Sequence, residues 1–183
     1  GIRAYPKFVK VSCGGAHCLG MTATGNIYSW GCSENERLGR SSLSGIMGMV
    51  QIPRKAIDIA AGPNFNIVVC KNTLYGFGKS GSHFGQDRVF DSRPLVIPSE
   101  FSFEKVACGD SACFAIQTFH DRLFSWGNAK TNGHGGKEDV YKPTKIEALK
   151  DEAIYAVSSS ISANYTVATT MTGTVYAWGF PYL

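Results

Sequence analysis

Cysteine is the first residue type in this chain that could do chemistry. Cys13 and Cys18 are separated by four residues, and the same spacing returns at Cys108 and Cys113. Thiolates bind zinc well, but structural zinc sites need four ligands and usually start from a closer pair. The two pairs belong to different repeats of the sequence, so convergence on one ion is geometrically awkward. We therefore interpret these cysteines as small buried residues and predict no metal site.

A glycine-rich segment and the histidines are the remaining candidates for chemistry. Residues 76–81 fit the G-x-G-x-x-G pattern of dinucleotide-binding loops. That pattern needs a following helix, and the next residues show no helical periodicity. The four histidines are His17, His83, His120 and His134; the sequence has no G-x-S-x-G nucleophile motif, and no acidic pair in a recognisable catalytic context. The sequence therefore predicts no catalytic residue, no cofactor and no enzyme activity.

The elements that hold these residues repeat along the chain. A second aromatic residue stands two positions before each of four aromatic-glycine pairs, and an aliphatic residue stands one position earlier still. This alternation has a period of two and is typical of a β-strand. The pairs follow one another at intervals of 47, 49 and 52 residues: Trp30-Gly31, Phe77-Gly78, Trp126-Gly127 and Trp178-Gly179.

Two more predicted strands precede the aromatic strand in each copy. The first strand ends at a small turn, at Gly14, Gly62 and Gly109, with Ser160 in the fourth copy. The second reaches the aromatic strand through a short polar turn rich in Gly, Asn or Asp, which is typical of a β-hairpin. A polar loop follows the aromatic strand and, in three copies, leads to an apolar segment with proline, as expected of an outer strand. Four-stranded units at this period indicate β-propeller blades.

The repeat resembles that of the regulator of chromosome condensation family. The first copy carries Cys13-Gly14-Gly15-Ala16-His17, Tyr28-Ser29-Trp30-Gly31 and Leu38-Gly39. The third copy matches well, the second and fourth are degenerate, and the resemblance covers residues 6 to 179 approximately. It implies that His17 hydrogen-bonds the turn between two strands, where the other copies have Phe65, Ala112 and Ala163. The structural residues of the repeat would be Gly14, His17, Trp30, Gly31, Gly62, Phe77, Gly78, Gly109, Trp126, Gly127, Trp178 and Gly179.

The predicted fold class is all-β, a partial or open β-propeller of three to four four-stranded blades. One domain would span residues 1–183, with repeat cores at about 9–39, 57–85, 105–135 and 154–179. A β-sandwich, the main alternative, would not explain four copies in phase. The resemblance implies about seven blades, so four repeats leave two open faces. We expect missing blades of the same propeller in a longer chain, or a partner that caps the arc; self-association is a third possibility.

The loops after the aromatic-glycine pairs are the predicted binding surface. In a propeller they gather on one side of the disc, and rigid strands with variable loops often present binding residues. We predict a non-enzymatic scaffold, or a subunit of a larger assembly, that binds a protein partner there. The candidate residues are Glu34, Glu36, Arg37, Arg40, Lys79, Asp87, Arg88, Lys130, His134, Lys137, Glu138 and Asp139.

The resemblance leaves a second function open, because the founding family member is a guanine nucleotide exchange factor for Ran. The alternative is exchange on a Ran-like small GTPase, with chromatin contact, although the exchange residues cannot be placed on this chain. The net charge of +4 is spread along the sequence, so direct nucleic-acid contact is not expected. Neither a signal peptide nor an apolar run of about 18 residues is present, and we expect no membrane contact. Six cysteines without a disulfide framework favour an intracellular, reducing compartment, cytoplasmic or nuclear.

Overall fold

The computed structural model describes residues 5–41, 43–79, 81 and 91–179, and almost all regular structure in them is β-strand. The strands form four antiparallel sheets, which we call blades 1 to 4. Blade 1 contains β1 (Phe8–Cys13), β2 (His17–Thr22), β3 (Ile27–Gly31) and β4 (Gly48–Val50). Blade 2 contains β5 (Ala56–Ala61), β6 (Phe65–Cys70), β7 (Thr73–Gly78) and β8 (Asp91–Ile97). Blade 3 contains β9 (Phe103–Cys108), β10 (Ala112–Gln117), β11 (Leu123–Gly127) and β12 (Val140–Lys145), and blade 4 contains β13 (Ile154–Ser159), β14 (Tyr165–Thr170) and β15 (Val175–Gly179).

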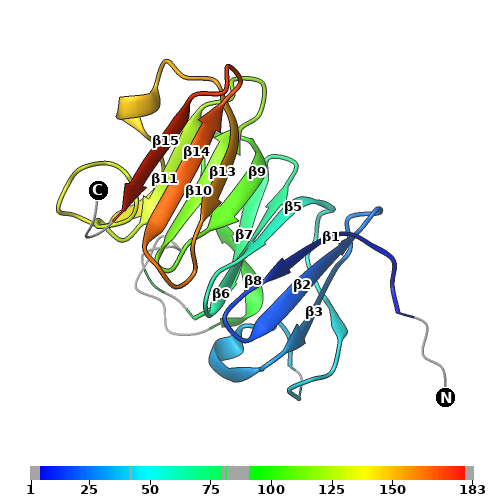
Figure 1. Cartoon of the computed structure of the whole chain (residues 1–183). Helices are drawn as coiled ribbons and strands as arrows, with labels where there is room; N and C mark the ends of the chain where they lie inside the picture. Colours follow the sequence, from blue (N-terminus) through cyan, green and yellow to red (C-terminus); the bar gives the residue numbers. More distant parts are fainter. Residues whose placement is uncertain (1–4, 42, 80, 82–90, 180–183) are drawn as a thin grey trace.

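The four blades follow one another in an arc, with blades 1 and 4 at opposite ends (Figure 1). The first strand of each blade contacts the first strand of the next, so β1, β5, β9 and β13 line the inner side. Each blade is a meander of sequential strands. Two short 3₁₀ turns, η1 (Glu34–Glu36) and η3 (Glu147–Leu149), lie in the connections. This architecture confirms the predicted all-β, open propeller.

The hydrophobic core is divided into three clusters, one between each pair of neighbouring blades. We call the side of a blade that faces the preceding blade its front face and the opposite side its back face. In β6, Val68 and Cys70 pack on blade 1, whereas Ile67 and Val69 pack on blade 3. Because both faces of β6 are covered, the strand is apolar almost throughout, as expected of a strand buried on two sides.

The glycine after each repeat aromatic is required by the backbone. Gly31, Gly78, Gly127 and Gly179 have φ angles of 108°, 109°, 112° and 147°. A Cβ on Gly127 would lie 2.4 Å from the carbonyl oxygen of Ser111, and a Cβ on each of the other three glycines would lie 1.9–2.7 Å from the corresponding turn carbonyl. The same Ser111 oxygen accepts a hydrogen bond of 2.8 Å from the amide of Asn128. Gly78 is therefore explained by the repeat, which removes the reason to assign residues 76–81 to a nucleotide.

We expect Gly127→Ala to be far more destabilising than Gly135→Ala. Both glycines have positive φ angles, so each alanine incurs a backbone penalty of about 1–2 kcal/mol. Only at Gly127 does the new Cβ also collide with backbone, because nothing lies within 4 Å of a Cβ at Gly135. Urea unfolding should show a loss of about 3 kcal/mol or more for Gly127→Ala, from strain and overpacking together. Equal losses for the two variants would contradict this account of the repeat glycine.

Candidate protein-binding face

The predicted binding loops lie together at one edge of the blades. Because neighbouring strands are antiparallel, the loops after β3, β7 and β11 leave from the edge that also carries the turns after β1, β5, β9 and β13. We call this edge the loop face; the β2–β3 and β6–β7 hairpins lie at the opposite edge. Of the predicted residues, Asp87 and Arg88 lie outside the described part of the chain. The exposed ones on the loop face are Glu34, Glu36, Lys79, Lys130, Lys137 and Glu138.

Arg37 and Arg40 are predicted binding residues that the structure places inside the first loop. Arg37 is buried, and its Nε donates a hydrogen bond of 2.7 Å to the carbonyl oxygen of Glu34. Arg40 is half-buried and donates from Nε and Nη2 to the hydroxyl and carbonyl oxygens of Ser29, at 3.1 and 2.9 Å. Burial lowers the pKa of the Arg40 guanidinium from its usual value. The Arg37 side chain therefore fixes the loop internally, and Arg40 attaches the loop to β3.

His134 and Asp139 hold the third loop in a similar way. His134 is half-buried, with its Nε2 3.0 Å from the hydroxyl of Ser125. Asp139 accepts a hydrogen bond of 2.9 Å from the amide of Ala129, across the base of the same loop. Neither side chain extends from the loop tip, so the tip is represented by Lys130, Lys137 and Glu138.

A buried histidine–asparagine pair links the first loop to blade 2. His17 Nε2 lies 2.7 Å from Asn66 Oδ1, and Asn66 Nδ2 donates a hydrogen bond of 2.8 Å to the carbonyl oxygen of Arg37. The expected role of His17 in its own turn is therefore corrected: its ring bonds the neighbouring blade. Sequence reasoning missed Asn66, although a polar residue inside an otherwise apolar strand is a detectable signal. His17 pairs with Gly31, and in the fourth copy Tyr165 pairs with Gly179. The counterpart of His17 there is therefore Tyr165, and the prediction of Ala163 is wrong.

The protonation of His17 is set by these contacts. Asn66 uses its amide group as a donor to Arg37, so its Oδ1 must accept from a protonated Nε2. Nδ1 is buried and has no hydrogen-bond partner among the described residues. A second proton there would carry an unpaired buried charge, so burial lowers the pKa of His17, and the nearby Arg37 lowers it further.

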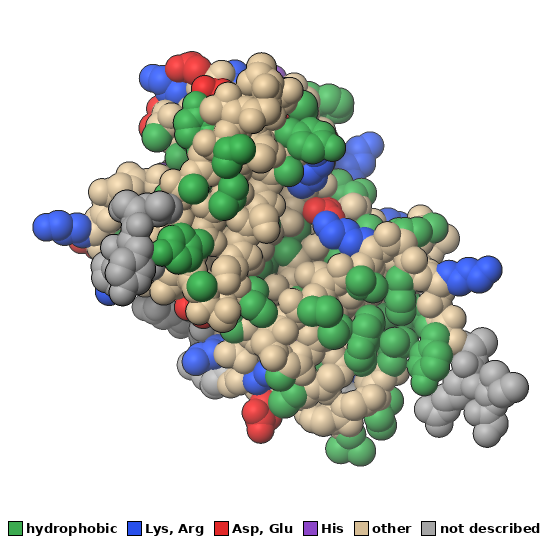
Figure 2. All heavy atoms as spheres, in the orientation of Figure 1, with side chains coloured by type: hydrophobic (Ala, Val, Ile, Leu, Met, Phe, Trp, Pro, Cys, Tyr) green, Lys and Arg blue, Asp and Glu red, His purple; other side chains and the backbone are tan. Residues whose placement is uncertain are grey.

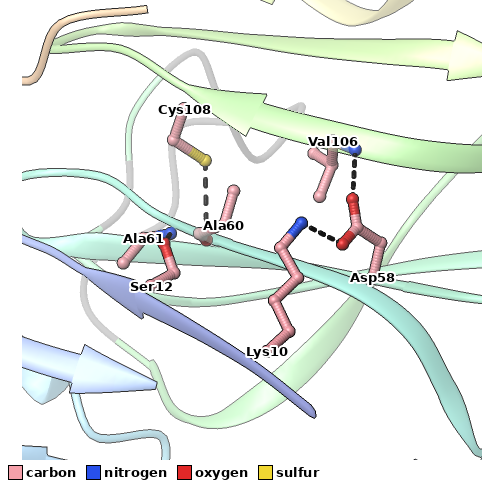
Figure 3. A network of polar contacts seen from close by, with 7 residues as sticks. All are labelled: Lys10, Ser12, Asp58, Ala60, Ala61, Val106 and Cys108. Carbon is pink, nitrogen blue, oxygen red and sulfur yellow. Dashed lines mark hydrogen bonds and ion pairs between the residues drawn. The ribbon is translucent and has the colours of Figure 1, made fainter. Parts of the chain in front are cut away.

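The inner strands are joined by a second polar network, shown in Figure 3. Asp58 of β5 pairs with Lys10 of β1, and its other carboxylate oxygen accepts a hydrogen bond of 2.9 Å from the amide of Val106 in β9. Ser12 Oγ accepts from the amide of Ala61 at 3.0 Å. One nearly buried carboxylate therefore links three successive blades. Both carboxylate oxygens of Asp58 thus have a partner within the chain.

The cysteine pairs differ in burial. Cys108 and Cys113 are buried between blades 2 and 3, as predicted. Cys13 is exposed on the front face of blade 1, which corrects the expectation of burial there; its Sγ lies 3.5 Å from Sγ of Cys18. Burial raises the pKa of the Cys18 thiol to about 11. No three His, Cys, Asp or Glu side chains of the described residues lie close enough to hold a metal ion.

Comparison with known proteins identifies the repeat. Residues 8–36 match the sequence model of the Regulator of chromosome condensation (RCC1) repeat. The chain is 29% identical over 187 residues to the E3 ubiquitin-protein ligase HERC2 of Homo sapiens, across 94% of this chain and 4% of that protein. It is 28% identical over 191 residues to the Ultraviolet-B receptor UVR8 of Arabidopsis thaliana, across 95% of this chain and 41% of the receptor. Residues 8–36 therefore form an RCC1 repeat, and the chain is similar along most of its length to proteins with that repeat.

Solved structures share the RCC1-type fold. Human WBSCR16 superposes with a TM-score of 0.84 at 19% identity, covering 97% of this chain and 48% of the other. Prp20p of Saccharomyces cerevisiae superposes with a TM-score of 0.73 at 20% identity, covering 98% of this chain and 47% of the other. The chain thus spans less than half the length of each of these relatives. Among the described residues no helix has the length and apolar character of a membrane span.

We expect the stability of the chain to fall below pH 6.5, and His17→Gln to reduce that fall. Since the folded pKa of His17 is lowered from 6.5, the unfolded chain takes up a proton that the folded chain does not. The stability that neutral His17 provides is complete above pH 6.5 and is lost as the pH drops below it. Thermal unfolding from pH 7.5 to 5.5 measures the effect, with His120→Gln at an exposed position as the control. Identical pH profiles for wild type and His17→Gln would contradict the assignment.

Proposed function

We propose that this RCC1-repeat chain is a non-enzymatic scaffold that binds a protein partner through its loop face. The observation that carries the proposal is that each loop has a fixed base and an exposed, charged tip. Their bases are fixed by buried hydrogen bonds, such as that from Ser29 Oγ to the carbonyl oxygen of Leu38 at 2.7 Å. Their tips expose charged side chains. A rigid frame lowers the entropy that binding would otherwise cost.

The charges at the loop tips suit a protein partner. Glu34 and Glu36 are exposed on the first loop, whereas the third loop exposes Lys130, Lys137 and Glu138. A surface of both signs can match a partner of complementary pattern, and such complementarity governs specificity and the association rate. Nucleic acid would favour a surface of one sign, because its phosphates dominate affinity.

Exchange on a Ran-like small GTPase is the second candidate function. The supporting observation is the likeness to Prp20p, which is described with binding properties to Gsp1p and histones. At 20% identity that likeness concerns the fold, so the GTPase and the histones serve as the first probes to test. Accelerated release of a fluorescent GDP from a Ran-type GTPase would favour this candidate over a passive scaffold.

A charge swap on the loop face tests the scaffold. We expect Lys137→Glu with Glu138→Lys to weaken capture of the partner at least tenfold, because the charges at the loop tip no longer match those of the partner. The double variant keeps the net charge of the chain, so only the charge pattern is tested. The matched control is Lys71→Glu with Glu100→Lys, two exposed residues near the opposite edge. Pull-down from a cell lysate, followed by quantitative mass spectrometry, compares the two double variants with the wild type. Equal capture by all three proteins, or no capture by the wild type, would contradict the proposal.

A further inference from the structure

The front face of blade 1 has the composition of a surface that another blade covers. In blades 2 to 4 the front face carries the first residue of the inner strand and the two aromatics of the third strand. Trp126 and Phe103 are 0% and 2% exposed in blade 3, and Phe77 is 0% exposed in blade 2. By strand register, the matching residues of blade 1 are Phe8, Tyr28 and Trp30.

These three rings are already arranged as in a covered blade. The rings of Phe8 and Tyr28 meet edge to face at 5.8 Å between centroids, as Phe103 and Phe124 do at 5.3 Å. The ring of Trp30 stacks on Phe8 at 5.6 Å. A hollow of about 680 Å³ opens beside them, lined by Tyr5, Pro6, Tyr28, Trp30, Gly45, Ile46 and Met47. Figure 2 shows hydrophobic side chains gathered over this N-terminal sheet.

The internal seams show what covers such a face. Gly39, in the first loop, lies over Phe77, where an added Cβ would be 2.5 Å from the ring. Gly133, in the third loop, lies equally close to Trp178, whose Nε1 donates a hydrogen bond of 3.2 Å to the carbonyl oxygen of Thr131. Each of these aromatics is covered by the loop and back face of the preceding blade. No described segment of this chain covers Trp30 in that way.

The complementary face lies at the other end of the arc, on the back of blade 4. Val175 and Ala177 occupy the positions held in blade 1 by Ile27, which is buried against blade 2, and Ser29, which is buried beneath the first loop. Val175 is 61% exposed, and Val167, which pairs with Ala177 from β14, is 40% exposed. This face and the front face of blade 1 carry no Lys, Arg, Asp or Glu in their paired strand positions. Their contact would bury no charge, which removes the main cost of such an interface.

We infer that the front face of blade 1 binds the back face of blade 4 of a second copy of this chain. Both halves of a blade-to-blade seam are present on one molecule, and the three internal seams supply the template for the contact. A contact between two different surfaces closes a ring when both seams form. The inference does not rest on the loop-face function.

The oligomeric state of the full chain tests the inference. Sedimentation velocity should show a species of twice the 19.8 kDa monomer mass. Met49→Lys, beside Tyr28 on the front face, and Val175→Lys should each weaken self-association at least tenfold. Both residues are exposed in the single copy, so the variants should fold. Phe119→Lys is the control, since this 93% exposed residue lies on a hairpin outside both faces and should leave the dimer intact.

A mixing experiment distinguishes this seam from other dimers. Met49→Lys keeps an intact blade 4 face and Val175→Lys keeps an intact blade 1 face, so their mixture should regain association through one seam. Maleimide labelling of the exposed Cys13 should also slow as the wild type self-associates. A wild type that stays monomeric at its highest soluble concentration would overturn the inference. So would a dimer that survives both front-face and back-face variants, or one that Phe119→Lys disrupts.

Discussion

The seam between neighbouring blades is the contact on which the rest of this structure depends. A single four-stranded blade has two apolar faces and cannot cover either by itself. In blades 2 and 3 the middle strands β6 and β10 are almost completely buried because a blade packs on each side. Water is excluded at each seam by an aromatic side chain from one blade and small or aliphatic side chains from the other. Stability therefore depends on neighbours, as in other repeat proteins.

The seams also fix the loops that we propose as the binding surface. Asn66 of blade 2 holds the backbone of Arg37 in the first loop, and Trp178 of blade 4 holds Thr131 in the third. A loop is thus anchored by the blade that follows it and not only by its own. A change at a seam would move a loop tip, whereas a change at a tip would leave the seam intact. The fold and its candidate function are linked in this one direction.

The repeat framework could be predicted because the same local requirement recurs in every copy. Gly78 and Gly127 both need a positive φ and both approach a turn carbonyl, so they stand in phase in the sequence. The roles of charged residues could not be predicted in this way. Arg37 is buried because the folded loop offers its side chain the carbonyl oxygen of Glu34, a contact that no local pattern predicts. The fourth copy was misaligned because its first turn is longer, and Cys13 is exposed because blade 1 has no preceding blade among the described residues.

Burial of both faces by neighbouring blades stabilises this chain. Hydrogen exchange measured by mass spectrometry on a monomeric sample reports this stabilisation strand by strand, because protection reflects the free energy of local opening. We expect the slowest exchange in β6 and β10, and faster exchange in β2 and β14, because no blade of the described residues covers the front of β2 or the back of β14. Equal protection of all four middle strands, or slower exchange in β14 than in β10, would contradict it.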